Sequence, residues 1–423
     1  MSTAVKQGNI LDKAGLPSHL FWGYLGVIIF MMGDGLEIGW LSPYLVDKGL
    51  SVSHAGFLFT AYGITVAISS WLSGVLLEAF GAKKTMLMGL IVYLVGTIGF
   101  VGFAIPNLWY PLMLLTYAIR GFGYPLFAFS FLVWIAYRTP SKQLGKAVGW
   151  FWFVFTGGLN VAGAYYSIWA IENLGHINTL WTAALWVSLG AVFALLFNKD
   201  KIEESTNDVE ESKAKEIVKG ITILKNEPKV AMAGIVRVIN QTAQYAFPIF
   251  LPTYLATYGY DTSLWLSIWG SIFVANIVFN IVFGVLGDKM GWRNTVMWFG
   301  GVGCGIFTLT LYYIPQIFGD NMFLLATAGL LWGTCLAGYV PLSALVPSLV
   351  NEDKGAAMSI LNLGAGLCVF TGPMIVALTY DFIGAGGVIW VLAALYFGGA
   401  FMTKFITLPG NRKTVEVIEE KEA

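Results

Sequence analysis

The sequence has few charged side chains and no excess of either sign. Only 11% of its 423 residues are Asp, Glu, Lys or Arg, and the formal net charge is zero. An ordinary soluble domain has about 25% charged residues, so this composition excludes a water-soluble enzyme. The lack of a basic excess also argues against nucleic acid as a partner.

Cysteines and catalytic motifs are equally scarce. The three cysteines lie in apolar runs and lack the spacing of a metal site or a disulfide framework. We find no phosphate-cradling loop, no paired-histidine metal motif and no nucleophile elbow. The sequence therefore predicts neither an enzyme nor a protein with a cofactor or a bound metal.

Apolar residues, in contrast, make up 57% of the chain and gather into long runs. A membrane-crossing helix needs roughly 20 predominantly apolar residues, and twelve stretches meet that requirement. The predicted fold is therefore all-α and integral to the membrane, with twelve transmembrane helices. The stretches cover about 20–45, 55–80, 85–103, 108–137, 145–170, 179–197, 230–258, 263–287, 296–317, 322–346, 355–380 and 387–406.

One long polar segment divides these stretches into two sets of six. Residues 198–229 are rich in Glu and Lys. We therefore expect one six-helix bundle over 1–197, a linker loop over 198–229 and a second six-helix bundle over 230–423. Nearly all loop Lys and Arg residues fall on the side that holds both termini, and the positive-inside rule predicts that this side is cytoplasmic.

The two halves repeat each other at an offset of 210 residues. Gly145 and Gly355 open the fifth and eleventh stretches at this offset. A glycine–acid–glycine–base motif closes the second and the eighth stretch, at Gly74, Glu78, Gly81 and Lys83 and again at Gly284, Asp288, Gly291 and Arg293. Parallel repeats are typical of transporters with a substrate site at mid-membrane, and we expect the motif to gate the cytoplasmic side.

The doubled motif, the twelve stretches and the central polar segment resemble the major facilitator superfamily over essentially the whole chain. Three segments of the first half, 13–24 (KAGLPSHLFWGY), 33–37 (GDGLE) and 119–126 (IRGFGYPL), further resemble the bacterial polyol permeases, which carry ribitol and arabinitol. This resemblance implies a monomeric secondary transporter of the bacterial cytoplasmic membrane that imports a pentitol or related sugar. Some members of that group are labelled dicarboxylate permeases.

Four charged residues, Asp34, Glu37, Arg120 and Arg237, fall inside the predicted helices. Each ionised side chain costs roughly 2.5–3.5 kcal/mol at mid-membrane, so these residues must face one another or water. Asp34 and Glu37 are three residues apart and would share a helix face. We expect this pair, together with Arg120, to handle the proton of a symporter. The alternative is that Asp34 pairs with Arg120 only to hold two helices together. Arg237 lies about two turns from the cytoplasmic start of its predicted helix, and its alternative is a structural role in which the side chain extends to that interface.

A row of polar side chains follows the predicted seventh helix, and Gln244 lies 210 positions after Asp34. Carboxamides donate and accept hydrogen bonds without charge, which suits a neutral, hydroxyl-rich solute. We therefore expect a polyol–proton symporter that works by alternating access. Its predicted substrate-binding residues are Tyr124, Asn240, Gln241, Gln244, Tyr245 and Trp332.

Two other functions are compatible with the sequence. The same fold could carry a carboxylate such as 2-oxoglutarate, with Arg120 and Arg237 as anion clamps. A membrane sensor that binds a solute without moving it is the third possibility. The 198–229 segment has no recognisable output domain, which argues against the sensor.

Overall fold

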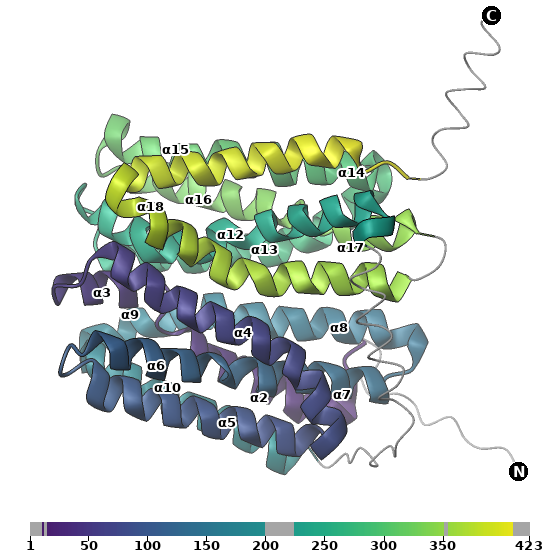
Figure 1. Ribbon diagram of the computed structural model, residues 1–423, viewed down its shortest axis with the longest axis horizontal. Coiled ribbons are helices and arrows are strands. Elements are labelled where there is room, and N and C mark those ends of the chain that lie inside the picture. Colours follow the sequence, from purple (N-terminus) through teal and green to yellow (C-terminus); the bar gives the residue numbers. More distant parts are fainter. Residues whose placement is uncertain (1–10, 12–14, 199–223, 351–353, 409–423) are drawn as a thin grey trace, which may run out of the picture. The chain divides into compact units, whose positions relative to one another are not determined.

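A computed structural model describes residues 11, 15–198, 224–350 and 354–408, and every regular element within them is a helix (Figure 1). The predicted all-α fold is confirmed. The helices form two compact units, one of residues 1–44 and 61–205 and the other of residues 45–60 and 206–423. Most of the predicted linker, 198–229, lies outside the described residues.

The first unit contains the helices of the first half of the chain, and α3 and α4 cross its boundary with the second unit. Its elements in order are η1 (Ser18–Leu20), α2 (Phe21–Gly35), α3 (Leu41–Asp47), α4 (Val52–Phe80), α5 (Ala82–Gly99), η2 (Phe100–Ala104), α6 (Tyr110–Gly121), η3 (Pro125–Phe129), α7 (Ser130–Arg138), α8 (Ser141–Thr156), η4 (Gly157–Ala162), α9 (Gly163–Leu174), α10 (His176–Val192) and η5 (Phe193–Phe197).

The second unit has fewer and longer elements. They are α12 (Pro228–Ala256), α13 (Thr262–Met290), α14 (Trp292–Thr295), η6 (Val296–Gly303), α15 (Cys304–Phe318), α16 (Met322–Ala337), α17 (Leu342–Leu345), η7 (Val346–Leu349) and α18 (Lys354–Phe405).

Within the described residues, nine continuous helical segments are long and apolar enough to cross a membrane. Three further features account for the difference from the twelve predicted helices. The 52-residue α18 contains two of the predicted helices, which meet at a non-helical Gly384. The first predicted helix is divided between α2 and α3, and the seventh is α12, which at 29 residues is long enough but less apolar.

The internal repeat is present in the backbone. Helices α4 and α13 are both 29 residues long and lie 210 positions apart in the sequence. Glycines with positive φ recur at the same offset, at Gly49 and Gly259 and at Gly81 and Gly291. The two halves therefore share turn geometry as well as helix length.

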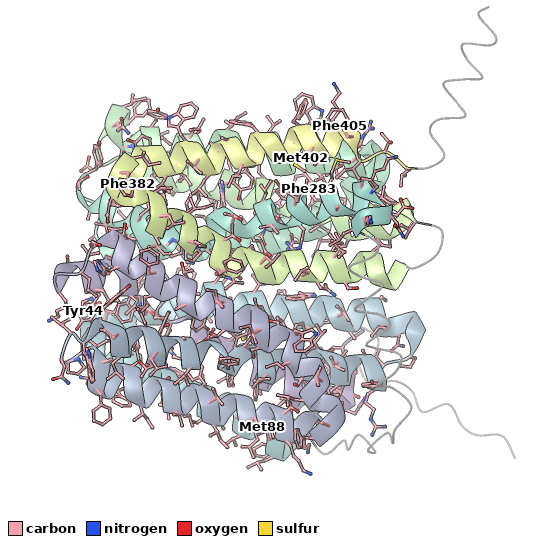
Figure 2. All side chains as sticks on the ribbon, in the orientation of Figure 1. Tyr44, Met88, Phe283, Phe382, Met402 and Phe405 are labelled. Atoms are coloured by element: carbon pink, nitrogen blue, oxygen red, sulfur yellow. The ribbon has the colours of Figure 1, made fainter. Side chains whose placement is uncertain are left out.

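Large apolar side chains face outward along the helices (Figure 2). On α5, Leu87, Ile91, Val95 and Ile98 recur every three or four residues and are 44–56% exposed. Phe382 on α18 is 87% exposed. Monomeric soluble proteins rarely expose such continuous apolar faces, and lipid tails provide the apolar surroundings that these faces require.

Small residues let α2 and α10 touch backbone to backbone. A Cβ atom on Gly26 would lie 2.5 Å from the carbonyl oxygen of Gly190, and a Cβ on Gly190 would lie 2.6 Å from that of Gly26. Close contact through small residues is a common way for helices to associate in membranes. This contact fixes α2, whose last turn carries Asp34.

Candidate functional site

The first helix stops in the middle of the first predicted membrane helix. Helix α2 ends at Gly35, residues 36–40 form turns, and α3 begins at Leu41. Gly39 has a φ of 97°, in the left-handed region that residues with a Cβ atom avoid. A continuous helix cannot pass through this conformation, so Glu37 lies in a break rather than on a helix face.

The backbone freed by this break finds side-chain partners. The carbonyl oxygen of Leu36 accepts a hydrogen bond from the indole N–H of Trp40 at 2.5 Å and another from the Ser167 hydroxyl. Irregular backbone at membrane depth is tolerated where the protein satisfies its polar groups. The turn is therefore a stable part of the first unit and holds Glu37 in place.

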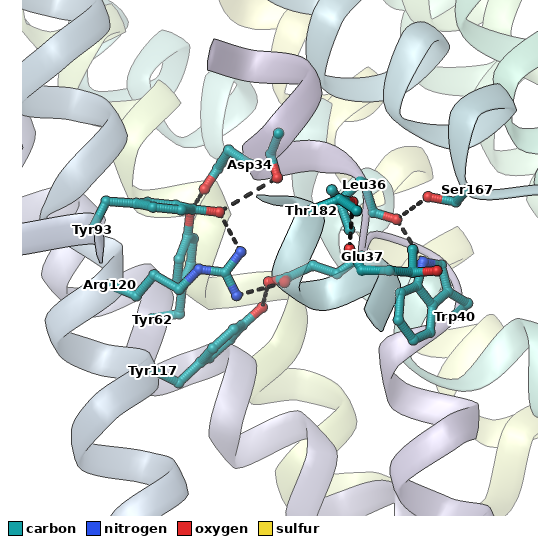
Figure 3. Close-up of polar contacts among 12 residues, drawn as sticks. Asp34, Leu36, Glu37, Trp40, Tyr62, Tyr93, Tyr117, Arg120, Ser167 and Thr182 are labelled. Carbon is teal, nitrogen blue, oxygen red and sulfur yellow. Dashed lines mark hydrogen bonds and ion pairs between the residues drawn. The ribbon is translucent and has the colours of Figure 1, made fainter. Parts of the chain in front are cut away.

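Glu37 forms an ion pair with Arg120 of α6 (Figure 3). Arg120 Nη1 donates to Glu37 Oε2 at 2.5 Å, and the Tyr117 hydroxyl donates to Glu37 Oε1 at 2.6 Å. Arg120 Nη2 donates to the Tyr93 hydroxyl, and the guanidinium carbon lies 4.6 Å from the centroid of the Tyr93 ring. Both members of the pair are buried, so charge, hydrogen bonds and a cation–π contact compensate the burial.

Asp34 has a different partner from the one considered from the sequence. Its Oδ1 atom accepts a hydrogen bond from the Tyr62 hydroxyl of α4 at 2.8 Å (Figure 3). Arg120 pairs with Glu37 and not with Asp34. Because α2 ends at Gly35, the expectation that Asp34 and Glu37 share a helix face is wrong. The two carboxylates occupy different local structures with different donors.

Three tyrosines of this cluster, Tyr62, Tyr93 and Tyr117, were not expected from the sequence. Tyr117 lies three residues before Arg120, a helical spacing that gives a local signal. Tyr62 and Tyr93 come from two other helices and have no such signal. Tyr124, a predicted substrate-binding residue, is 5% exposed and lies next to the cluster, with its ring centroid 6.5 Å from that of Tyr62.

The predicted polar row of the second unit lies on α12 as expected. Gln241 Nε2 donates to Gln244 Oε1 at 3.2 Å. The side-chain oxygen of Asn240 is buried without a partner among the described residues, and Tyr245 is half-buried on the same helix. Pro248 has no N–H for the carbonyl of Gln244, because proline removes the donor of the helical bond four residues back. The Asn240 side-chain oxygen is therefore an acceptor of this row that no described residue pairs.

Arg237 precedes Gln241 by one helical turn and is half-buried. Among the described residues, no carboxylate lies within ion-pair distance of its guanidinium group. A Cβ atom at Gly364 of α18 would lie 2.9 Å from Arg237 Cγ, so this glycine leaves room for the side-chain stem. The Cys368 thiol, one turn further on, lies 3.9 Å from Gln241 Oε1.

Trp332 lies in the packing of the second unit. It is fully buried, its indole N–H donates to Thr308 Oγ1 at 3.1 Å, and its ring packs against Phe247 at 5.0 Å between centroids. The polar atom that would contact a substrate is thus already bonded within the unit. A role for Trp332 in substrate binding stays a prediction.

The first copy of the repeated motif holds a helix end. Gly81, with a φ of 81°, separates α4 from α5. Lys83 Nζ donates to the carbonyl oxygens of Leu195 at 3.1 Å and Asn198 at 2.6 Å. A cation at the last carbonyls of a helix is favourable. The side chain of Glu78 lies outside the described part of the chain.

The second copy makes contacts of the same kind. Asp288 accepts from the indole N–H of Trp292 at 2.8 Å, and Arg293 donates to the carbonyl oxygen of Lys404 at 3.5 Å. A Cβ atom on Gly74 or Gly284 would meet nothing within 4 Å. These contacts hold helix ends within each unit, and a gating role for the motif stays a prediction.

Comparisons with known proteins match the whole chain. Alpha-ketoglutarate permease of Bacillus subtilis is 57% identical over 421 residues, which cover 100% of this chain and 96% of the relative. D-arabinitol transporter of Klebsiella pneumoniae is 37% identical, with 93% of each chain covered. Ribitol transporter of the same species is 35% identical, with 93% of this chain and 92% of the relative covered.

Solved structures and a family model agree on the fold. A D-xylose–proton symporter aligns with a TM-score of 0.66 at 16% identity, over 94% of this chain and 97% of the other. Nucleoside transporter NupG aligns with a TM-score of 0.69 at 15% identity, over 92% and 99%. The model of the Major Facilitator Superfamily matches residues 23–276 and 267–423. The chain therefore belongs to the Major Facilitator Superfamily and is a multi-pass membrane transporter.

Proposed function

We propose that this chain transports 2-oxoglutarate or a similar small dicarboxylate. The observation that carries the proposal is Arg237, an arginine within a membrane helix that has no carboxylate partner among the described residues. An unpaired charge at membrane depth is costly, and a substrate carboxylate would complete a bidentate pair with the guanidinium group. The relative that is 57% identical and is named alpha-ketoglutarate permease supports the same substrate.

The surroundings of Arg237 favour an anion. Gln241 and Gln244 follow it along α12, and their side-chain amide groups carry N–H donors. Amide donors stabilise carboxylate oxygens, and a keto oxygen is a further acceptor for them. A negative ligand would therefore find one cation and several neutral donors on the same helix.

Arg120 is a poor anion clamp because Glu37 already neutralises it. A substrate carboxylate at Arg120 would have to displace Glu37 and leave that carboxylate buried without its cation. Loss of a partner in a buried ion pair costs about 3–5 kcal/mol. The sequence-based hypothesis assigned both Arg120 and Arg237 to the dicarboxylate. We now assign only Arg237 to it.

We infer further that transport is coupled to protons through Asp34. Import of a dianion against an inside-negative potential costs roughly 2.3 kcal/mol per charge per 100 mV, and accompanying protons cancel this cost. Protonation of Glu37 would strand the buried cation of Arg120, whereas protonation of Asp34 breaks no ion pair. Asp34 is therefore the carboxylate that can exchange a proton at the smaller cost.

Polyol transport is the second candidate function. The Gln241–Gln244 pair suits a neutral, hydroxyl-rich solute, and the D-arabinitol and ribitol transporters are 37% and 35% identical to this chain. This candidate leaves Arg237 without a partner. For that reason we propose a dicarboxylate, rather than a polyol, as the substrate.

Counterflow in proteoliposomes tests the substrate. Vesicles with purified protein are loaded with unlabelled 2-oxoglutarate and diluted into labelled 2-oxoglutarate, with ribitol and D-arabinitol as competitors. We expect labelled 2-oxoglutarate to accumulate, neither polyol to inhibit, and Arg237→Gln to lower the signal at a 2-oxoglutarate concentration near the wild-type KM. Counterflow of ribitol that 2-oxoglutarate does not inhibit would overturn the dicarboxylate in favour of a polyol. Binding of either solute without counterflow would indicate a sensor.

The coupling test compares two modes of transport in Asp34→Asn. Counterflow needs no net proton movement, so the variant should retain it. Accumulation driven by an imposed pH gradient should be lost, because the amide cannot carry a proton. Accumulation at the wild-type level in Asp34→Asn would contradict coupling through Asp34.

A further inference from the structure

We propose that Tyr62 is a positioning residue that determines the pH at which Asp34 takes up and releases its proton. The inference rests on the proposed coupling through Asp34. The Tyr62 hydroxyl donates to Asp34 Oδ1 at 2.8 Å, and no other side chain among the described residues donates to that carboxylate. Asp34 is 5% exposed, whereas Tyr62 is half-buried. Tyr62 is thus the more accessible of the two.

Helix α4 is hydrogen-bonded to the end of α6 near Tyr62. Thr65 Oγ1 donates to the carbonyl oxygen of Ala118 at 2.7 Å, and Ser69 Oγ donates to that of Phe122 at 2.8 Å. A Cβ atom at Gly121 would lie 2.2 Å from Thr65 Oγ1, so the two helices are in close contact here. These bonds set the height of Tyr62 beside the ion pair, because Tyr62 lies one turn before Thr65.

The ring of Tyr62 lies among other aromatic rings of the cluster (Figure 3). Its centroid is 4.9 Å from that of Tyr117, which donates to Glu37, and 6.5 Å from that of Tyr124. The ring of Tyr117 therefore lies against that of Tyr62 beside the ion pair. Tyr62 connects the fixed ion pair to the carboxylate that exchanges protons.

The charged and titratable groups that face Asp34 come from few elements. They are Tyr62 of α4, Tyr93 of α5, Tyr117 and Arg120 of α6, and Glu37 after α2. Of the other elements packed against α2, η4 and η5 carry no titratable side chain, η1 carries His19, and α10 carries only His176 at its first residue. On α8 and α9 the titratable residues with described side chains are Lys146, Tyr165, Tyr166 and Glu172, none of which bonds to Asp34.

A phenol is suited to both protonation states of a carboxyl group. Its O–H donates to an ionised carboxylate, and its oxygen accepts from a protonated one. Tyr62 can therefore keep its contact while a proton from water adds to Asp34 and later leaves it, and no covalent bond to Tyr62 forms or breaks. Removal of the hydroxyl takes away the donor that stabilises the ionised form.

The pH dependence of gradient-driven accumulation tests this role in Tyr62→Phe. Loss of one hydrogen bond to a charged group should move the half-maximal pH upward by about one unit. Counterflow at equal pH should stay within about twofold of wild type. The matched control is Tyr24→Phe, which removes a buried hydroxyl that donates to the Ala147 carbonyl at 3.0 Å, outside the cluster. It should leave the pH profile unchanged.

Two further variants keep the test decisive. Tyr62→Gln retains an N–H donor and should restore part of the wild-type profile, even if Tyr62→Phe folds poorly. The pH dependence of counterflow is measured in both backgrounds: Tyr62→Phe should shift it where Asp34 is present and leave it unchanged in Asp34→Asn, because the effect acts through Asp34. A shift that persists without Asp34 would overturn the inference.

The failures of this inference and of the proposed function are distinguishable. The profile is measured with whichever solute the wild type accumulates, so an error in the substrate does not affect it. A wild type that ignores the pH gradient overturns proton coupling and the role of Tyr62 together. Coupling that is present in the wild type and identical in Tyr62→Phe overturns the role of Tyr62 alone.

Discussion

The two units differ in whether their intramembrane arginine has an acidic partner. In the first unit, Arg120 is fully buried against Glu37, with Tyr93 and Tyr117 completing the hydrogen bonds. In the second unit, Arg237 has no acidic partner among the described residues. The contrast teaches that a cation neutralised by its own protein supports structure, whereas a cation left without an acid is available to an anionic ligand.

The contrast follows from a change of chemistry on a repeated framework. Asp34 ends a helix that breaks at Gly35, while its counterpart Gln244 lies in a helix that continues through Pro248 and Pro252 to Ala256. The first half thus carries two carboxylates, and the second carries carboxamides at the related place. We infer that proton exchange and substrate recognition are divided between the halves.

The largest effect should come from Glu37→Gln. The free energy of unfolding should fall by about 3–5 kcal/mol, because the buried Arg120 cation loses its partner. Denaturant unfolding in detergent, followed by tryptophan fluorescence, measures it. The double variant Glu37→Gln/Arg120→Gln should recover part of the loss, since no unpaired charge remains. If the double variant were as unstable as the sum of the single ones, the ion pair would not be the cause.

An intermediate effect, on transport rather than stability, should follow from Arg237→Gln. The KM for 2-oxoglutarate should rise about 10–100-fold, which corresponds to a lost charged hydrogen bond of about 1.5–3 kcal/mol. Initial rates of uptake measure it. Arg237→Lys keeps the charge but lacks the planar guanidinium group, so its KM should lie between those of the wild type and Arg237→Gln. A loss of stability as large as that of Glu37→Gln would show instead that Arg237 is structural.

The smallest effect should come from Trp332→Phe. This change removes the hydrogen bond to Thr308 and should lower the free energy of unfolding by about 1 kcal/mol. The KM should not change, because the indole N–H is used within the unit. Unfolding and initial uptake rates can be measured on the same preparation. A raised KM at unchanged stability would support a substrate-binding role for Trp332.

Much of the fold is predictable from the sequence, because apolar runs of membrane length and the 210-residue repeat report it directly. Charged residues within those runs also locate Asp34, Glu37, Arg120 and Arg237, since each needs a partner or water. Their mere presence in an apolar run is the signal.

The partners themselves are not predictable in this way. Glu37 and Arg120 are 83 positions apart, and the choice between Asp34 and Glu37 depends on the break after Gly35, which tertiary packing stabilises through Ser167. Tyr62 and Tyr93 reach the cluster from separate helices, and no spacing in the sequence links them to it.

Direct binding of labelled 2-oxoglutarate to the purified protein, measured by equilibrium dialysis, tests the central claim most directly. We predict that the wild type binds, that excess ribitol does not compete, and that Arg237→Gln weakens binding by at least about tenfold, or roughly 1.4 kcal/mol. Equal affinity of the wild type and Arg237→Gln for 2-oxoglutarate would contradict the assignment of this arginine to the substrate.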